Sequence, residues 1–248
     1  MAKSLPEIKL LRLTKTIGKN TILDSVSFEI KGYGITGYLG PNGAGKTTTL
    51  KILTNLIRPD SGQALINGID SRGYKKTLRY VSALVDVPEP YPDMTVKEFL
   101  SFIGGLRGIK KDALDNRINS LKRELSLEDL NRKCGELSKG NKQRVVIAAV
   151  LLPDTDIILL DEPTSGLDPA ESHDIKEILK KLKKRKLILL SSHLMDEVKE
   201  LCNYLILIDK GRVIASGTVR QIIKKFGKGK GEKGLESAYL NIVRRNHG

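Results

Sequence analysis

Apolar residues occur in short runs and in helical repeats along the chain, and the two patterns alternate. Short apolar runs bounded by turn residues are typical of buried strands. They predict strands over residues 8–13, 26–30, 35–39, 64–66, 78–85, 157–160, 187–190, 205–208 and 213–215, with the strands at 64–66 and 78–85 placed around the Asn67-Gly68 turn. Apolar residues that recur every three or four positions predict amphipathic helices between these strands. The chain is therefore expected to fold as an α/β protein.

Helical periodicity dominates one segment in the middle of the chain. Thr95-Val96-Lys97-Glu98 has the spacing of a capping box, which starts a helix. Apolar residues then follow at helical intervals, so we expect a helical insert from Pro92 to Lys133. With a further helix over 142–152, it is expected to form a helical subdomain over about 92–152. Other helices are expected over residues 45–56, after Asp168, and over 219–226 and 236–243.

The length of 248 residues is enough for one large domain. We expect residues 1–226 to form that domain, and residues 227–248 to add a basic linker, 227–234, and a short C-terminal helix. The longest wholly apolar run, Val145–Leu152, is shorter than the roughly 18 residues that indicate a membrane span. Charges near the N-terminus argue against a signal peptide, so a cytosolic protein is expected. Cys134 and Cys202 are expected to be reduced, structural thiols.

The net charge of +14 raises the question of a polyanionic partner. The lysines are spread along the chain, and aromatic residues make up only 4% of it. Proteins that recognise single-stranded nucleic acid use aromatic stacking platforms, which these lysines lack. A solvated basic surface is favoured over a nucleic-acid site, with attraction to an anionic membrane face as a variant.

A glycine-rich turn joins the strand expected at 35–39 to the following helix, with the sequence Gly40-Pro41-Asn42-Gly43-Ala44-Gly45-Lys46-Thr47-Thr48. Backbone N–H groups of such a loop converge on a phosphate, and the N-terminus of the helix adds positive potential. Lys46 is then expected to reach the outer phosphates, and the Thr47 hydroxyl can ligate Mg²⁺. The alternative is a flexible glycine turn, which the strand before it and the helix after it disfavour. The segment therefore predicts a site for nucleotide phosphates.

A second potential anion site lies at the start of the helix expected near residue 142. Ser138, Gly140 and Asn141 occur at that start, where a hydroxyl and free N–H groups can receive an anion. An ordinary serine N-cap explains the same residues when they are considered alone. Asp168, which precedes Pro169, is likewise an ideal N-cap without any further role.

Carboxylates and a histidine follow two of the expected buried strands. Asp161 and Glu162 end the strand at 157–160, and His193 follows the strand at 187–190. Ligands of open α/β sheets lie beyond the carboxyl ends of the strands, so all three side chains are expected near the nucleotide. Asp161 suits Mg²⁺, Glu162 suits polarising the attacking water, and His193 suits a hydrogen bond to the γ-phosphate. The alternatives are a loop-capping Asp-Glu pair and an incidental histidine.

The order and spacing of these segments resemble the ATP-binding subunit of ABC transporters, over about residues 8–226. Residues 40–47 resemble the Walker A loop, and 137–141 resemble the family signature usually written Leu-Ser-Gly-Gly-Gln. Residues 157–161 with Glu162 resemble Walker B and its catalytic carboxylate, 165–168 the D-loop, and His193 the switch histidine. The resemblance implies a P-loop NTPase core with a parallel sheet, an N-terminal antiparallel β lobe and the helical subdomain inserted in a RecA-like core.

The resemblance also implies a head-to-tail dimer that closes on ATP and opens on hydrolysis. ATP would lie between the Walker A loop of one subunit and Ser138, Gly140 and Asn141 of the other. The residues agree with this arrangement. One nucleotide needs a single anion-binding helix start, and this chain has two, so the second would serve a nucleotide bound to another subunit. The helical insert would carry the motion to an integral membrane permease, so the chain would lie at the inner face of the cell membrane.

The chain departs from the family pattern at two single positions and within the signature. The family usually stacks an aromatic residue on adenine near position 17, where Ile17 offers only apolar contact. Asp86 stands in place of the Q-loop glutamine and could still ligate Mg²⁺. Lys139 and Asn141 replace a glycine and the glutamine of the signature, a variation associated with export-type ATPases.

The leading hypothesis is therefore the ATPase subunit of a membrane exporter, with ATP and Mg²⁺ as cofactors. The runner-up is a non-transport ATPase of the same fold that acts on nucleic acid or ribosomes, motivated by the +14 charge. A third hypothesis, motivated by Ile17 and Asp86, is a nucleotide-binding module without turnover. The transported substrate is not encoded in this chain, because specificity belongs to the membrane subunit.

Overall fold

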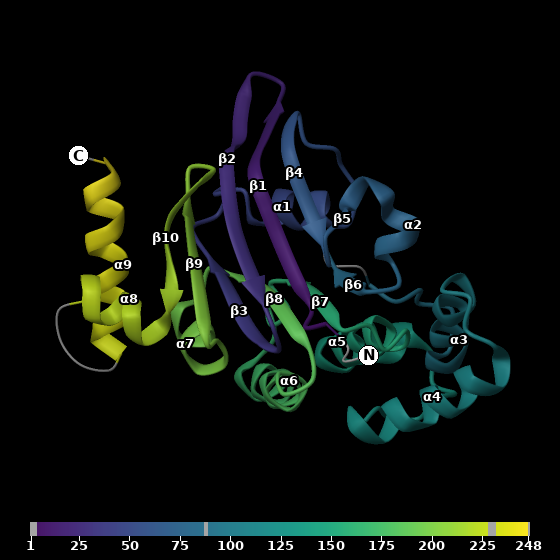
Figure 1. The fold of residues 1–248 in the computed structure, drawn as a ribbon. Helices are drawn as coiled ribbons and strands as arrows, with labels where there is room; N and C mark the ends of the chain where they lie inside the picture. The colour runs from purple at the N-terminus through teal and green to yellow at the C-terminus, as the bar shows by residue number, and fades with distance from the viewer. Residues whose placement is uncertain (1–3, 87–88, 228–231, 248) are drawn as a thin grey trace.

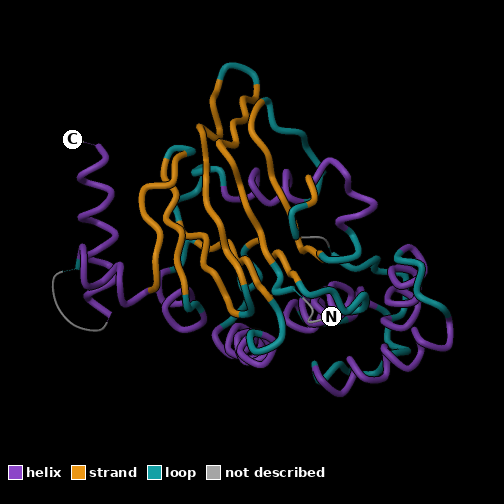
Figure 2. The backbone as a smooth tube through the Cα atoms, in the orientation of Figure 1, coloured by secondary structure: helices purple, strands orange, loops and turns teal. Residues whose placement is uncertain are grey.

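Two β-sheets form the centre of the molecule (Figures 1 and 2). The computed structural model describes residues 4–86, 89–227 and 232–247. One sheet is antiparallel, with the strand order β2 (Asn20–Lys31), β1 (Glu7–Ile17), β4 (Ser61–Ile66) and β5 (Ile69–Asp70). The other has the order β10 (Arg212–Thr218), β9 (Tyr204–Asp209), β3 (Gly34–Leu39), β8 (Leu187–Ser192), β7 (Ile157–Asp161) and β6 (Val81–Leu84).

The second sheet is parallel from β9 to β6, and only β10 runs antiparallel to its neighbour. Its central strands are apolar on both faces, as expected for parallel strands that are covered on both sides. In β7, Ile157 and Leu159 pack toward the antiparallel sheet, while Ile158 and Leu160 pack toward the helices. The parallel sheet with an N-terminal antiparallel lobe is therefore confirmed.

Helices cover the face of the parallel sheet that points away from the antiparallel sheet, and further helices lie at both of its ends. Helices α5 (Lys139–Leu151), α6 (Pro169–Leu182) and α7 (Met195–Leu201) run beneath it in Figure 1, whereas α1 (Lys46–Leu53) packs between the two sheets. Helices α3 (Val96–Leu106) and α4 (Lys111–Glu124) lie at the β6 end. The opposite end carries α8 (Val219–Phe226) and α9 (Glu232–His247) beside β10. The remaining pieces are α2 (Tyr74–Thr77) and the 3-10 turns Ser71–Gly73 and Cys134–Glu136.

The helical insert forms as its sequence predicts. Thr95 caps α3, and its hydroxyl accepts a hydrogen bond from the Glu98 N–H while the Glu98 carboxylate accepts one from the Thr95 N–H. Leu114, Ile118 and Leu121 of α4 are buried on one face. Both cysteines of the chain are buried and free, and burial raises their pKa values, which suits structural thiols. Among helices of the described residues, none combines the length and apolar character needed to cross a bilayer.

Several expected elements differ from the observed ones in their bounds or connections. The strand expected at 78–85 is shorter, because residues 78–80 form a turn, and it lies in the parallel sheet. The Asn67-Gly68 turn instead joins β4 to the two-residue β5, because residues 71–77 fold into helical turns directly afterwards. Helix α5 begins at Lys139 rather than at residue 142, because Ser138 caps it.

The expected linker at 227–234 is also shorter than predicted. Gly227 ends α8, residues 228–231 lie outside the described residues, and Glu232–Gly234 belong to α9. Leu235, Ala238 and Ile242 of α9 are buried in the same core as the helices under the parallel sheet. Burial of these apolar side chains holds the C-terminal helix against the rest of the protein.

Candidate functional site

The phosphate loop connects β3 to α1 at the carboxyl edge of the parallel sheet. Gly40 passes so close to the next strand that a Cβ there would lie 2.2 Å from the Ile208 carbonyl oxygen. Gly45 precedes α1 with a φ of 102°, a conformation that favours glycine. Glycine has no side chain to cap the helix, so the first N–H groups of α1 remain free to bind an anion. The loop thus has the backbone geometry of a phosphate site.

A cavity of about 570 Å³ opens over this loop. Its lining combines loop residues, the carboxylates after β7 and apolar side chains of the antiparallel sheet. The lining residues are Ile17, Ile22, Asn42, Gly43, Gly45, Lys46, Thr47, Thr48, Asp86, Asp161, Glu162 and Ser165. The volume falls within the range of small-molecule sites, roughly 300–1,000 Å³. The structure therefore brings most of the predicted nucleotide-binding residues into one space.

Lys46 points back into the loop. Its Nζ donates to the carbonyl oxygens of Gly40 at 2.9 Å and Pro41 at 3.0 Å, and lies 3.7 Å from Glu162 Oε1. Only 5% of the side chain is exposed. Burial lowers the pKa of Lys46, although the nearby carboxylates of Glu162 and Asp161 act in the opposite direction. An incoming phosphate would replace neutral carbonyls with charged oxygens as partners of this ammonium.

Asp161 is the last residue of β7 and Glu162 follows it, and different contacts hold the two side chains. Asp161 is buried and its carboxylate accepts a short hydrogen bond from the Ser191 hydroxyl of the neighbouring strand. Glu162 adopts a left-handed φ of 44°, and its N–H donates to the Ser191 carbonyl oxygen at 3.1 Å. The backbone therefore turns sharply between the two residues and directs the Glu162 side chain toward Lys46.

His193 reaches the same carboxylate from the end of β8. Its Nδ1 lies 3.0 Å from Glu162 Oε1, and the side chain is 37% exposed. Lys46, Glu162 and His193 thus form a chain of contacts, although the described lining of the cavity includes only the first two. The expectation that the strand ends place these side chains together is met in the geometry.

A buried carboxylate that sequence reasoning missed supports these loops. Glu197 of α7 accepts hydrogen bonds from the hydroxyls of Thr164 and Ser192, each at 2.6 Å. Ser192 precedes His193, and Thr164 precedes the cavity residue Ser165. The carboxylate therefore ties the loop after Glu162 to the end of β8.

Two of the residues that depart from the family pattern, Ile17 and Asp86, also lie at the cavity. Ile17, 54% exposed at the end of β1, and Ile22 on β2 form its apolar wall. Asp86 has a φ of 50° and lies 2.7 Å from Lys51 Nζ, so Lys51 already neutralises its charge. Ligation of Mg²⁺ by Asp86 would require the carboxylate to leave Lys51. Thr47 and Asp161, in contrast, offer a hydroxyl and a carboxylate oxygen to the same cavity, and oxygen ligands suit Mg²⁺.

The second predicted anion site lies elsewhere. The lining of the cavity, taken over the described residues, leaves out Ser138, Gly140 and Asn141. Ser138 caps α5 and its hydroxyl accepts from the Asn141 N–H at 3.2 Å, while the Asn141 side chain donates to Glu128. Asp168 caps α6 by accepting from the Glu171 N–H at 2.8 Å. The phosphate loop and the start of α5 therefore lie at separate places on one chain.

Several site residues carried no signal in the sequence. Nothing in the sequence around Ile22 indicates a cavity residue, and Ser191 looks only like the polar end of a buried strand. Lys51 lies one and a half turns after Lys46 on α1, and only the position of Asp86 in space gives it a partner. The glycine loop, the strand ends and the helix caps could be found because their chemistry follows from local sequence.

Comparison with known proteins gives a consistent result. The family model described as "ABC transporter" matches residues 23–165. The chain is 38% identical over 201 residues to "ABC transporter ATP-binding protein NatA" of Bacillus subtilis, which covers 79% of this chain and 82% of the relative. It is also 38% identical over 214 residues to "Nod factor export ATP-binding protein I" of Burkholderia lata, covering 85% of this chain and 70% of that protein.

A solved structure agrees with the fold over almost the whole chain. The "Structure of ATP binding subunit of ABC transporter" superposes with a TM-score of 0.83 and 29% sequence identity. The match covers 95% of this chain and 99% of that chain. The antiparallel lobe, the parallel sheet and the helical insert described above are therefore features that the two proteins share.

Proposed function

Since this chain belongs to the ABC transporter family, as an ATP-binding and ATP-hydrolysing subunit, we propose that it works as one half of a head-to-tail ATP sandwich. The proposal is supported by the distance between the two segments that the sequence predicts to bind anions. Residues 40–48 and the carboxylates form one cavity, whereas Ser138 and Gly140 lie outside its described lining. A second ATPase subunit, identical or paired, would bring its Ser138 and Gly140 to the γ-phosphate.

In this sandwich each residue of the cavity has a defined task. The loop amides and Lys46 stabilise the charge of the transferred phosphoryl group. Thr47 and Asp161 would hold Mg²⁺, which neutralises charge on the phosphates. Glu162 orients or deprotonates the attacking water, and His193, held by Glu162, contacts the γ-phosphate. Ile17 and Ile22 contact the base by apolar packing alone.

Cysteine cross-linking tests the head-to-tail arrangement. We expect a mixture of Asn42→Cys and Ser138→Cys proteins to give a covalent dimer with a bifunctional thiol reagent and Mg-ATP. The native Cys134 and Cys202 are buried, so they would compete little for the reagent. Each variant alone is the control and should stay largely uncrosslinked. A mixture that gives no more dimer than the single variants at saturating Mg-ATP would rule out this arrangement.

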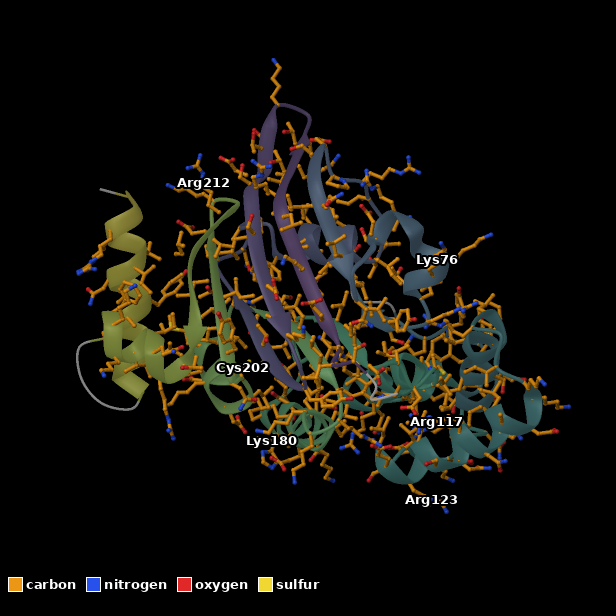
Figure 3. All side chains as sticks on the ribbon, viewed as in Figure 1. Lys76, Arg117, Arg123, Lys180, Cys202 and Arg212 are labelled. Atoms are coloured by element: carbon orange, nitrogen blue, oxygen red, sulfur yellow. The ribbon has the colours of Figure 1, made fainter. Side chains whose placement is uncertain are left out.

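Export is the direction of transport that we propose. The Burkholderia lata relative is named as an export protein. Lys139 and Asn141 in the signature of this chain are the variation associated above with export-type ATPases. The chain would then work at the inner face of the cell membrane, attached to an integral membrane permease. Figure 3 shows basic side chains on separate elements, such as Lys76 on α2, Arg123 on α4 and Lys180 on α6. This distribution favours a dispersed attraction to an anionic surface over a compact nucleic-acid site.

An apolar groove beside the helical insert is the surface that we assign to the permease. Tyr91, Phe99, Ile103 and Val146 contribute to a cavity of about 280 Å³ between α3 and α5. Tyr91 is 53% exposed, and its ring packs edge-on against Phe99, with centroids 6.1 Å apart. Phe99 is buried inside the groove, so Tyr91 is the exposed aromatic residue at its rim. An exposed aromatic residue beside an apolar groove is typical of protein interaction sites. The groove adjoins β6, which leads to Asp86 at the nucleotide cavity, so docking here would be linked to the ATP site.

Replacement of Tyr91 by aspartate is expected to release the permease without affecting the ATP site. Loss of an aromatic anchor typically costs about 2 kcal/mol or more, roughly a 30-fold loss of affinity. Co-purification of the membrane subunit from detergent-solubilised membranes measures this effect. Tyr33→Asp is the matched control, because Tyr33 is 45% exposed and lines a different pocket with Asn203 and Tyr204. Equal retention of the permease by both variants would show that the groove is not the docking surface.

A further inference from the structure

The carboxylate of Glu171 lies beside Ser138 and Gly140, where the γ-phosphate would bind in the proposed sandwich. Its Oε1 accepts a hydrogen bond from the Gly140 N–H at 2.9 Å and lies 3.3 Å from the donating Ser138 hydroxyl. These are the two donors that a phosphate oxygen of the opposite subunit would use. The start of α5 therefore already binds a carboxylate that belongs to the same subunit.

Glycine at position 140 allows the Glu171 carboxylate to approach the start of α5 closely. A Cβ on Gly140 would lie 2.4 Å from Glu171 Oε1, so a larger residue would require the Glu171 side chain to move. The fold also fixes the position of Glu171. Pro169 begins α6, and the Asp168 carboxylate accepts a hydrogen bond from the Glu171 N–H, which sets the first turn of that helix against α5. The contact between Glu171 and Gly140 thus links the first turn of α6, directly after the D-loop, to the signature helix α5.

We propose that Glu171 is a built-in competitor of the γ-phosphate and sets the ATP concentration at which two subunits close. The proposal rests on the head-to-tail sandwich proposed above. A carboxylate and a phosphate cannot both accept hydrogen bonds from the same two donors. Their negative charges would also repel each other if both lay beside Ser138 and Gly140. Closure on ATP therefore requires Glu171 to withdraw from Ser138 and Gly140. The cost of that withdrawal holds the subunits apart until nucleotide fills the cavity.

Removal of the carboxylate should make closure easier. In a Glu162→Gln background, which slows hydrolysis, Glu171→Ala is expected to lower the Mg-ATP concentration for half-maximal dimer formation by about tenfold, the effect of one charge-assisted hydrogen bond. Glu171→Gln should have a smaller effect in the same direction, because its amide oxygen can still accept a weaker bond. Sedimentation velocity at increasing Mg-ATP gives the dimer fraction. Glu177→Gln is the control, since Glu177 lies on the same helix but pairs with Lys180.

Two measurements separate the possible failures. ATP affinity of the monomer, measured by fluorescence of a bound ATP analogue, should not change in either Glu171 variant, because Glu171 does not belong to the described lining of the cavity. If the Glu162→Gln parent itself stays monomeric, the sandwich model fails. If the parent dimerises and both folded Glu171 variants need as much ATP as the parent, or more, then the carboxylate only supports the signature helix and the proposal is overturned.

Discussion

Lys46→Ala is expected to lower the affinity for ATP by at least about 100-fold. The ammonium would give up the carbonyl oxygens of Gly40 and Pro41 for phosphate oxygens, and hydrogen bonds between charged groups are worth about 1.5–3 kcal/mol each. The variant loses these bonds and also the positive charge at the centre of the phosphate loop. Isothermal titration with Mg-ATP measures the loss directly.

The control for this variant is Lys75→Ala, which removes an equal charge from the exposed surface of α2. Its affinity for ATP should match that of the unaltered protein. Circular dichroism should show that both variants are folded, because Lys46 lies at the start of α1. If folded Lys46→Ala bound Mg-ATP as tightly as the control, the assignment of residues 40–48 as the phosphate site would be wrong.

Glu162→Gln is expected to reduce the rate of ATP hydrolysis by about 1,000-fold and to leave ATP binding intact. The amide cannot accept a proton from the attacking water, and general-base catalysis is typically worth a factor of about 100 to 10,000. The substitution keeps the size of the side chain, so contacts with Lys46 and His193 can be replaced by hydrogen bonds. A coupled phosphate-release assay gives kcat, and titration with Mg-ATP gives affinity.

His193→Gln is the informative comparison for this loss. Nδ1 of His193 contacts Glu162, so we expect kcat to fall in this variant too, by less than in Glu162→Gln. A Glu162→Gln protein that hydrolysed ATP at the unaltered rate would show that another group activates the water. Glu197 would be a poor substitute, because it is buried outside the described lining of the cavity and holds the hydroxyls of Thr164 and Ser192.

Local sequence chemistry predicted most of the elements that carry the site. The apolar runs at 35–39, 157–160 and 187–190 gave β3, β7 and β8, and parallel pairing then required their carboxyl ends to meet at one edge. The capping signals of Thr95 and Asp168 also correspond to observed caps. Features of this kind depend on residues that are close in sequence or on a general rule of sheet topology, so they can be predicted from the sequence alone.

The contacts between distant segments could not be predicted in this way. The Glu171 carboxylate meets Gly140 across 31 positions of the chain, and Asp86 meets Lys51 across the cavity wall. The strand expected at 78–85 was misplaced because an apolar run does not reveal which sheet it joins. In each case the outcome depends on how separate elements pack, and local periodicity carries no information about that packing.

The central claim is that ATP holds two subunits together, and the sedimentation of Glu162→Gln with saturating Mg-ATP tests it most directly. The account predicts a monomer without nucleotide and a dimer with Mg-ATP, because the bound γ-phosphate then joins the phosphate loop of one subunit to Ser138 and Gly140 of the other. Lys46→Ala in the same background should abolish the dimer. A Glu162→Gln protein that binds Mg-ATP fully and still sediments as a monomer would contradict the account.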